Sequence, residues 1–328
     1  METLEQTGLC FPQLLNSSCR KPIRPHFETM LIYILLSFIS LLTAALNLLV
    51  IISISHFKQL HTPTNLLLLS LAVSDFFVGL LMFFQIILIN GCWFLGDLIC
   101  TLYSVLEYIL TSASVGTMVL ISVDRYVAIC HPLHYSTKIT VRGAELCTCL
   151  CWVCSALYNS LIMKDNLKEP GRYNSCIGQC VIVIDHVAGL VDLFLTFIGP
   201  VTVIVILYMR VFVVAVSQAR AMRSHIAVGT IQSSVKVAKK SELKAAGTLG
   251  VVIVVFLLCL CPYYCVTLTG QDTMLNASSA AFVICLFYFN SCLNPLIYTF
   301  FYPWFRKSVR LIVTLQILKP DSYKLNIL

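Results

Sequence analysis

Charged residues are scarce in this chain of 328 residues. Only 11% are Asp, Glu, Lys or Arg, and 59% are hydrophobic, whereas a soluble domain carries about 25% charged residues. This composition excludes an ordinary soluble domain and indicates a protein that crosses a membrane several times. The net charge of +7 does not indicate nucleic-acid binding, because the basic residues gather in short connections beside apolar segments and set membrane topology.

Other absences exclude further classes of protein. No lysine falls inside an apolar segment, which excludes a retinal Schiff base. No paired repeat with broken helices is visible, which argues against a transporter. No nucleophile–base pair or metal-ligand spacing is apparent, so we expect neither an enzyme nor a cofactor. Residues 1–29 contain no early apolar core, so we expect the first apolar segment itself to direct membrane insertion.

The apolar residues form seven segments, each long enough for ~20 residues of helix across ~30 Å of hydrocarbon. The sequence therefore predicts an all-α membrane protein with a seven-helix bundle at 30–301. We expect 1–29 to be an extracellular N-terminus and 302–328 a cytoplasmic region that starts with a short amphipathic helix at the inner interface. The segments are 30–55, 65–89, 99–130, 146–163, 187–216, 245–268 and 280–301.

Basic residues predict the orientation of these segments. Seven lie between the fifth and sixth segments and three follow the seventh, so we expect both regions to be cytoplasmic and the N-terminus to be outside. The sequons at Asn16 and Asn276 then both fall on the outer side, as glycosylation requires. Arg20, Lys21 and Arg24 argue mildly against this orientation. The basic residues counted are Arg210, Arg220, Arg223, Lys236, Lys239, Lys240 and Lys244, then Arg306, Lys307 and Arg310.

The seventh segment ends in Asn290-Ser-Cys-Leu-Asn294-Pro295-Leu-Ile-Tyr298. A proline inside a membrane helix breaks the backbone ladder, so this helix is suited to bending. The run resembles the seventh helix of rhodopsin-like G-protein-coupled receptors, and with Tyr302-Pro-Trp304-Phe305 it resembles the fingerprint of trace amine-associated receptors. The resemblance covers nearly the whole chain. It implies a plasma-membrane receptor for a small amine, a heterotrimeric G protein that raises cyclic AMP as partner, and olfactory expression.

The same resemblance assigns the residues that transmit the signal. Asp124-Arg125-Tyr126 ends the third segment, where a buried arginine needs an anion. The family pairs this arginine with the adjacent aspartate and with an acid before the sixth segment, here Glu242. In the family, two tyrosines at the positions of Tyr208 and Tyr298 meet through water on activation.

Asp75 lies in the middle of the second segment, where an unpaired carboxylate costs several kcal/mol. The family motifs place Asn47, Ser114, Asn290 and Asn294 around it. Oxygen-bearing side chains of this kind suit a hard monovalent cation with water. The resemblance implies an allosteric sodium ion that stabilises the inactive state, and the alternative is a polar network filled with water.

Glu107 and Asp192 are the candidate ligand-binding acids. Glu107 lies eighteen residues before Arg125, or roughly 27 Å along a helix, which places it in the outer third of the membrane. Asp192 lies eight residues before Pro200, about two turns, and should face the same cavity. With no basic partner, the two acids predict a diamine or polyamine ligand. The family's pocket positions add Tyr108, Thr111, Thr196, Tyr263, Tyr264 and Tyr288.

Two alternatives to the diamine remain open. Asp192 could be a solvated residue at a helix end, and the chain would then be a biogenic amine receptor of the serotonin type that binds a monoamine through Glu107 alone. Leu260 stands where the family usually has tryptophan, so the family's account of activation does not carry over whole. Leu46 replaces the glycine that usually precedes Asn47.

The sixteen cysteines divide into two groups. Steps of two along a helix turn neighbouring thiols apart, so the cysteines between 147 and 154 are expected to be apolar helix residues rather than metal ligands. The resemblance implies a disulfide between Cys100 and Cys180. It also implies a bond from Cys176 to the N-terminus, where Cys19 is favoured over Cys10. These bonds would close a lid over the pocket.

Overall fold

The structure is a computed structural model that describes residues 8–14, 16–21, 26–227, 250–251, 254–266, 277–320, 322–325 and 327. Within this part the chain is helical and contains only isolated β-bridges, from Leu9 to Arg20 and from Ser18 to Ile177. Five of the described helices are long and apolar enough to cross a membrane, and two shorter apolar helices, Val254–Val266 and Phe282–Ile297, lie within the sixth and seventh segments expected from the sequence.

The first long helix begins at His26, so the expected boundary after residue 29 falls inside it. The fourth begins at residue 141 rather than 146, because Thr140 caps it by accepting a hydrogen bond from the backbone N–H of Gly143. In chain order the helices are α2 (His26–His56), α3 (Pro63–Ile89), α4 (Asp97–Cys130), α5 (Pro132–Lys138), α6 (Val141–Ile162), α7 (Lys164–Lys168), α8 (His186–Leu193), α9 (Gly199–Ala227), α11 (Ala277–Phe301) and α12 (Pro303–Val313).

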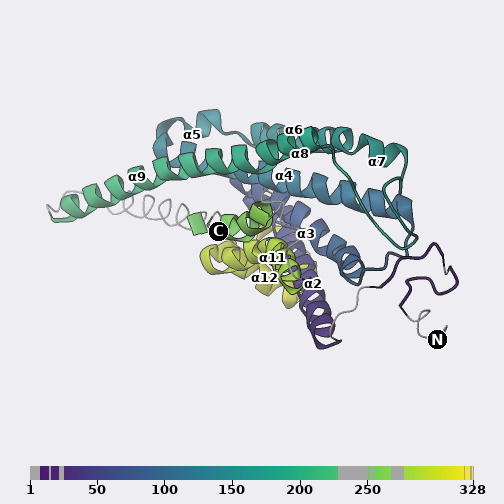
Figure 1. The fold of residues 1–328 in the computed structure, drawn as a ribbon. Helices are drawn as coiled ribbons and strands as arrows, with labels where there is room; N and C mark the ends of the chain where they lie inside the picture. Colours follow the sequence, from purple (N-terminus) through teal and green to yellow (C-terminus); the bar gives the residue numbers. More distant parts are fainter. Residues whose placement is uncertain are drawn as a thin grey trace.

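The long helices pack side by side into a bundle (Figure 1). Helix α3 lies between α2 and α4, α4 also contacts α6 and α9, and α11 packs on α2 and α3. Helices α2 and α3 approach each other tightly at Gly79, whose carbonyl accepts a hydrogen bond from the Ser40 hydroxyl at 2.6 Å. A Cβ atom at Gly79 would lie 2.9 Å from the backbone nitrogen of Ala44, so this contact requires glycine.

The fifth membrane helix is interrupted by a π-helical turn, η2 (Phe194–Ile198), between α8 and α9. A π turn inserts an extra residue into the α-helical spacing. The register between Asp192 and Pro200 therefore differs from the regular two turns that the sequence predicts. Thr196, inside this turn, is buried.

Below the bundle, α12 packs its buried Trp304 and Phe305 against the core cluster that includes Phe57 and Leu60. The chain then reverses at Leu315, which adopts a left-handed conformation. The C-terminal segment returns to the end of α2, where Ser322 and His56 are hydrogen-bonded at 3.0 Å and Ile327 is buried in the same cluster.

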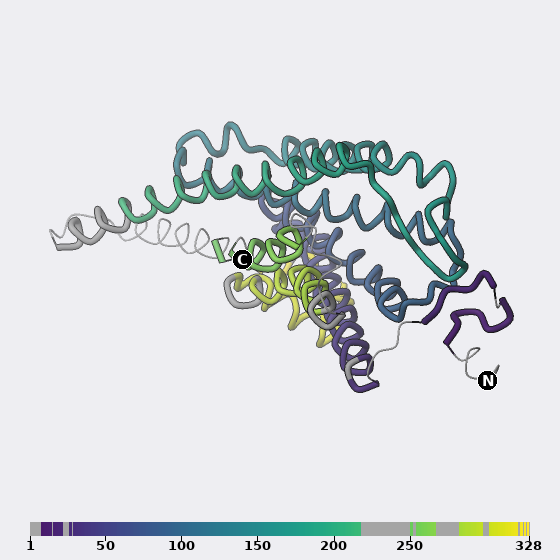
Figure 2. Tube along the Cα trace, viewed as in Figure 1, coloured from purple at the N-terminus to yellow at the C-terminus, as the bar shows by residue number. Residues whose placement is uncertain are grey.

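Three disulfides fasten the end of the bundle that lies beside the N-terminal segment. Cys100 is bonded to Cys180 and Cys19 to Cys176, with Cα–Cα distances of 5.7 and 5.1 Å. Both are the pairs favoured from the sequence. Cys10, the alternative partner for Cys176, is instead bonded to Cys92 between α3 and α4. The N-terminal segment thus lies against the loop that joins α7 to α8, as the purple and teal traces of Figure 2 show.

Cys19→Ser and Cys176→Ser should each lower agonist potency, because either change releases the N-terminal segment from the loop over the pocket. The double variant should be no worse than either single one, because both remove the same link. Cys10→Ser combined with Cys19→Ser should be worse than either alone, because two links are lost. Dose–response curves at matched surface expression measure these effects. Additive losses in the Cys19/Cys176 pair would show that the two are not partners.

Candidate functional site

A cavity of about 530 Å³ opens among α4, α6, α8, the helix Val254–Val266 and α11. All eight side chains expected from the sequence at a ligand site line it: Glu107, Tyr108, Thr111, Asp192, Thr196, Tyr263, Tyr264 and Tyr288. Residues 184–186, which follow the disulfide-bonded loop, line its outer part. The cavity volume lies in the range that small-molecule sites occupy.

At one end of the cavity, the Tyr288 hydroxyl of α11 donates a hydrogen bond to Glu107 of α4. Nearby, Tyr103 donates to the Gln85 side chain at 2.8 Å. The rings of Tyr263 and Phe287 lie 4.9 Å apart between centroids and are tilted, and Phe287 meets Tyr288 edge to face at 5.5 Å. The Glu107 end therefore combines one carboxylate with a wall of aromatic rings, an arrangement that favours an organic cation.

Asp192 marks a second acidic point in the cavity. It lies close to Tyr158 and Thr196, yet its buried Oδ1 atom has no hydrogen-bond partner. The Thr196 hydroxyl donates to the backbone carbonyl of Asp192 at 2.7 Å. Among the residues that the structure describes, neither lysine nor arginine lines the cavity. No lysine or arginine of the described wall therefore compensates the charge of this carboxylate.

A smaller space of about 20 Å³ lies below the cavity, bordered by Asp75, Ser114 and Asn290 among others. Asp75 is fully buried, and its Oδ2 atom accepts a hydrogen bond from Asn294 at 2.8 Å. Its Oδ1 atom has no partner in the described structure, and neither do the side-chain oxygens of Asn290 and Asn294. The orphaned oxygens of Asp75 and Asn290 border a space that can hold about one water-sized particle, and this donor set suits a small monovalent cation.

Asn47 does not contact Asp75 in the way that the sequence analysis expects. Its side-chain nitrogen donates to the backbone carbonyls of Thr43 and Ser291, both at 3.0 Å, and it makes no hydrogen bond to Asp75. Its role is to tie α2 to α11 beside the small space. Leu260, which replaces the family's tryptophan, is buried and borders that space from the helix Val254–Val266.

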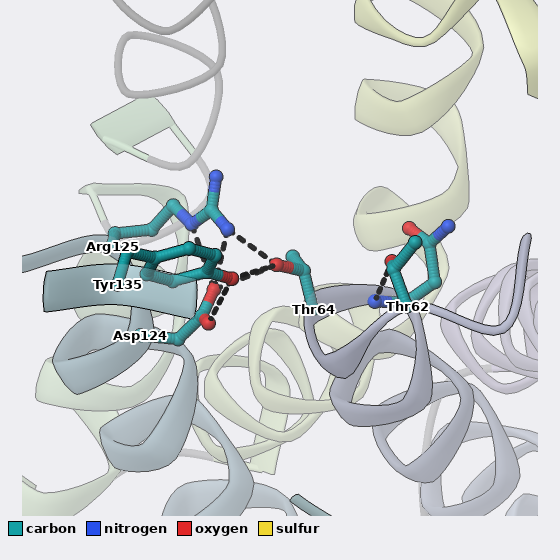
Figure 3. A network of polar contacts seen from close by, with 6 residues as sticks. Thr62, Thr64, Asp124, Arg125 and Tyr135 are labelled. Atoms are coloured by element: carbon teal, nitrogen blue, oxygen red, sulfur yellow. Dashed lines mark hydrogen bonds and ion pairs between the residues drawn. The ribbon is translucent and has the colours of Figure 1, made fainter. Parts of the chain in front are cut away.

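Near the C-terminal end of α4, Asp124 and Arg125 form a closed network with two further residues (Figure 3). Arg125 donates to Asp124 Oδ2 through Nε at 2.9 Å and to the Thr64 hydroxyl of α3, which in turn donates to Asp124 at 2.8 Å. Tyr135 of α5 donates to Asp124 Oδ1 at 2.8 Å. Burial raises the pKa of the Tyr135 hydroxyl, which therefore remains a donor. Arg125 is thus held by an ion pair with Asp124, the residue that precedes it.

The structure describes three other assigned positions only in part or not at all. Glu242 and Asn276 lie outside the described residues, and of Tyr298 only the helical backbone is described. Tyr208 extends a buried hydroxyl that has no hydrogen bond within the described part. The Tyr126 ring contacts the His131 ring edge to face at 5.6 Å, which supports the turn between α4 and α5.

The structure also shows polar residues at these sites that the sequence analysis missed. Gln85, Asn159, Asp185 and His186 line the cavity, while Thr64 and Tyr135 belong to the network of Arg125. Asn159 carried a detectable signal, since it is an amide inside an apolar segment, where polar side chains are costly. The others lie in or near loops, where a polar residue is unremarkable in a sequence.

Comparison with known proteins agrees with this architecture. The sequence profile described as 7 transmembrane receptor (rhodopsin family) matches residues 46–298. The chain is therefore a receptor of the rhodopsin family rather than an enzyme, with a small-molecule ligand and a G protein as partners.

Full-length relatives narrow the assignment. The chain is 39% identical to trace amine-associated receptor 8a of Rattus norvegicus, over 96% of this chain and 94% of the relative. It is 38% identical to trace amine-associated receptor 13c of Danio rerio, over 98% and 97%, and 37% identical to trace amine-associated receptor 4 of Mus musculus, over 97% and 94%. The chain belongs to the trace amine-associated receptors.

Tyr135→Phe should raise basal G-protein activation, because it removes a donor that holds Asp124 in the network with Arg125. A hydrogen bond to a charged group is worth about 1.5–3 kcal/mol, which predicts a shift of roughly ten- to a hundredfold toward the active state. Arg125→Ala should abolish signalling while surface expression and ligand binding remain. Nucleotide exchange measured without ligand tests Tyr135→Phe, and nucleotide exchange stimulated by an amine agonist tests Arg125→Ala. Full signalling by a well-expressed Arg125→Ala receptor would contradict the assigned role.

Proposed function

We propose that this receptor binds a small diamine or polyamine, with Glu107 and Asp192 as the counter-ions of two ammonium groups. The observation that carries the proposal is that both carboxylates line one cavity whose described wall contains no lysine or arginine. A carboxylate removed from water needs a compensating cation or donors. Tyr288 supplies one donor to Glu107, but Asp192 Oδ1 has none in the described structure.

A diamine satisfies both acids at once. Its ammonium groups replace the missing donors, and its methylenes lie against the rings of Tyr263, Tyr264 and Phe287. A monoamine neutralises one acid and leaves the other without a partner. The alternative, a monoamine receptor of the serotonin type that uses Glu107 alone, is favoured by the aromatic surroundings of Glu107, which suit a single organic cation.

The proposal includes the receptor's topology. Seven spans place 1–29 outside and 302–328 in the cytoplasm, with Val254–Val266 and Phe282–Ile297 as the described parts of the sixth and seventh spans. The exposed Asn16 is then accessible to a glycan on the outer side, as Asn276 would be. We further propose plasma-membrane localisation, coupling to the G protein that raises cyclic AMP, and an olfactory role, all of which rest on the family alone.

Glu107→Gln and Asp192→Asn should each cripple the response to a diamine. Removing one partner of a buried charge pair costs on the order of 3–5 kcal/mol, which corresponds to roughly two to four decades in potency. The response to a monoamine analogue of equal chain length should be lost in only one of the two variants. Cyclic-AMP dose–response curves for both ligands on both variants make the comparison. Unchanged diamine potency in Asp192→Asn would leave the monoamine alternative.

We also propose that Asp75, Ser114, Asn290 and Asn294 hold a sodium ion. The bound ion would supply positive charge to Asp75 and favour the inactive state. Asp75, Asn290 and Asn294 contribute the orphaned oxygens described above, and Asn294 fixes the Asp75 carboxylate from α11.

Replacing KCl by NaCl at constant ionic strength should lower agonist potency on the unchanged receptor. Asp75→Asn should remove this dependence, because it removes the charge that the ion neutralises. Agonist dose–response curves in membranes at several sodium concentrations measure the effect. An equal sodium dependence in both receptors would place the ion elsewhere.

A further inference from the structure

Asn159 is a fully buried residue that nevertheless lines the ligand cavity. It lies seven residues after Trp152 on α6, and therefore on the same face of the helix. The Trp152 indole donates to the Ser70 hydroxyl of α3 at 3.0 Å, which fixes that face toward the inside of the bundle. The position of Asn159 in the wall is thus set by the packing of α6.

The orientation of the Asn159 amide is fixed as well. Its Nδ2 donates to the backbone carbonyl of Ser155 at 2.8 Å, while its buried Oδ1 has no partner in the described structure. Turning the amide over would place Oδ1 against that carbonyl, and two acceptors would then face each other. Asn159 therefore offers an acceptor, not a donor, and a buried acceptor requires a donor from water or a ligand.

We place this acceptor in the half of the cavity that contains Asp192, because both residues line the cavity and α6 approaches Asp192 at the residue before Asn159. Tyr158, the neighbour of Asn159 on α6, lies close to the Asp192 side chain. Asp192 Oδ1 is likewise buried and without a partner. The Thr196 hydroxyl has given its hydrogen to a backbone carbonyl, so its oxygen can only accept, either from the nearby Tyr264 hydroxyl or from a ligand. This half of the wall thus provides acceptors from Asp192, Asn159 and Thr196.

The Glu107 half is different in chemistry. Glu107 already receives the Tyr288 hydroxyl, and the Gln85 oxygen already receives Tyr103. The wall there includes the rings of Tyr263, Phe287 and Tyr288. Ring faces attract a cation without needing its N–H groups, and they accommodate N-methyl groups.

We propose that Asn159 is a specificity-determining residue that makes the Asp192 end of the cavity select a primary ammonium, whereas the Glu107 end accepts an N-methylated one. A primary ammonium has three N–H donors, which match the three acceptors at the Asp192 end. A dimethylammonium has one donor and leaves acceptors of this wall unsatisfied. The proposal rests on the two-acid function above, and it names the kind of amine that each end accepts.

Three probes with the same carbon chain separate the two ends. They are the most potent straight-chain α,ω-diamine, its analogue dimethylated on one nitrogen, and its analogue dimethylated on both. The singly modified diamine can place its primary ammonium at Asp192 and should retain most of the potency. The doubly modified diamine should lose about tenfold or more. Equal potency of the singly and doubly modified probes on the unchanged receptor would overturn the proposal.

Asn159→Leu tests the residue itself, because leucine keeps a similar volume but has no acceptor. The variant should lose about tenfold in potency for the unmodified diamine and little for the doubly modified one, so that discrimination between them collapses. Surface expression is measured in parallel, and Asn159→Ala gives the same ratio where leucine prevents expression. An equal loss for all three probes would indicate a structural role only and would overturn the proposal, as would an unchanged diamine potency.

Asp192→Asn distinguishes this inference from the function on which it rests. If Asp192→Asn leaves diamine potency unchanged, the two-acid function fails. If Asp192→Asn cripples the diamine response while Asn159→Leu does not, the two-acid function stands and the role of Asn159 is wrong.

Discussion

Carboxylates inside an apolar bundle must each receive hydrogen-bond donors or a cation, and this requirement organises the receptor from its outer to its inner side. Asp75 is met by Asn294, Asp124 by Arg125 with its neighbours, and Glu107 by Tyr288. Each of these contacts joins different helices or ends a helix, so satisfying the charges also fixes the packing. Asp192 is the carboxylate whose buried oxygen is left open to the cavity.

The ligand cavity and the small space beside Asp75 share part of their walls. Thr111 and Phe287 border both, and Leu260 lies on the lower side. A ligand that moves Phe287 therefore also changes the surroundings of Asp75, because packed interiors do not deform at one wall alone. Leucine is smaller than the tryptophan usual at position 260. Contact through Phe287 offers a physical route from ligand to Asp75 that does not depend on an indole ring.

Much of this site could be predicted because the chain closely follows its family. The eight pocket residues, the two expected disulfides and the pairing of Asp124 with Arg125 all occupy the places that the motifs indicated. Cys10–Cys92 was missed because connectivity depends on which loops meet, and spacing alone does not determine that. Asn159 was missed because its importance lies in the direction of one oxygen, which the carbonyl of Ser155 sets after α6 has packed.

The π turn at Phe194–Ile198 gives the fifth helix two registers, one above the turn and one below it. Each residue of an α-helix is rotated by about 100° from the last. Deleting a single residue within the turn would convert it to regular helix and swing Asp192 out of the cavity, while everything after Gly199 kept its place. The extra residue can thus arise or disappear in one evolutionary step. That step would remove the Asp192 side chain from the cavity without substituting any residue that lines it.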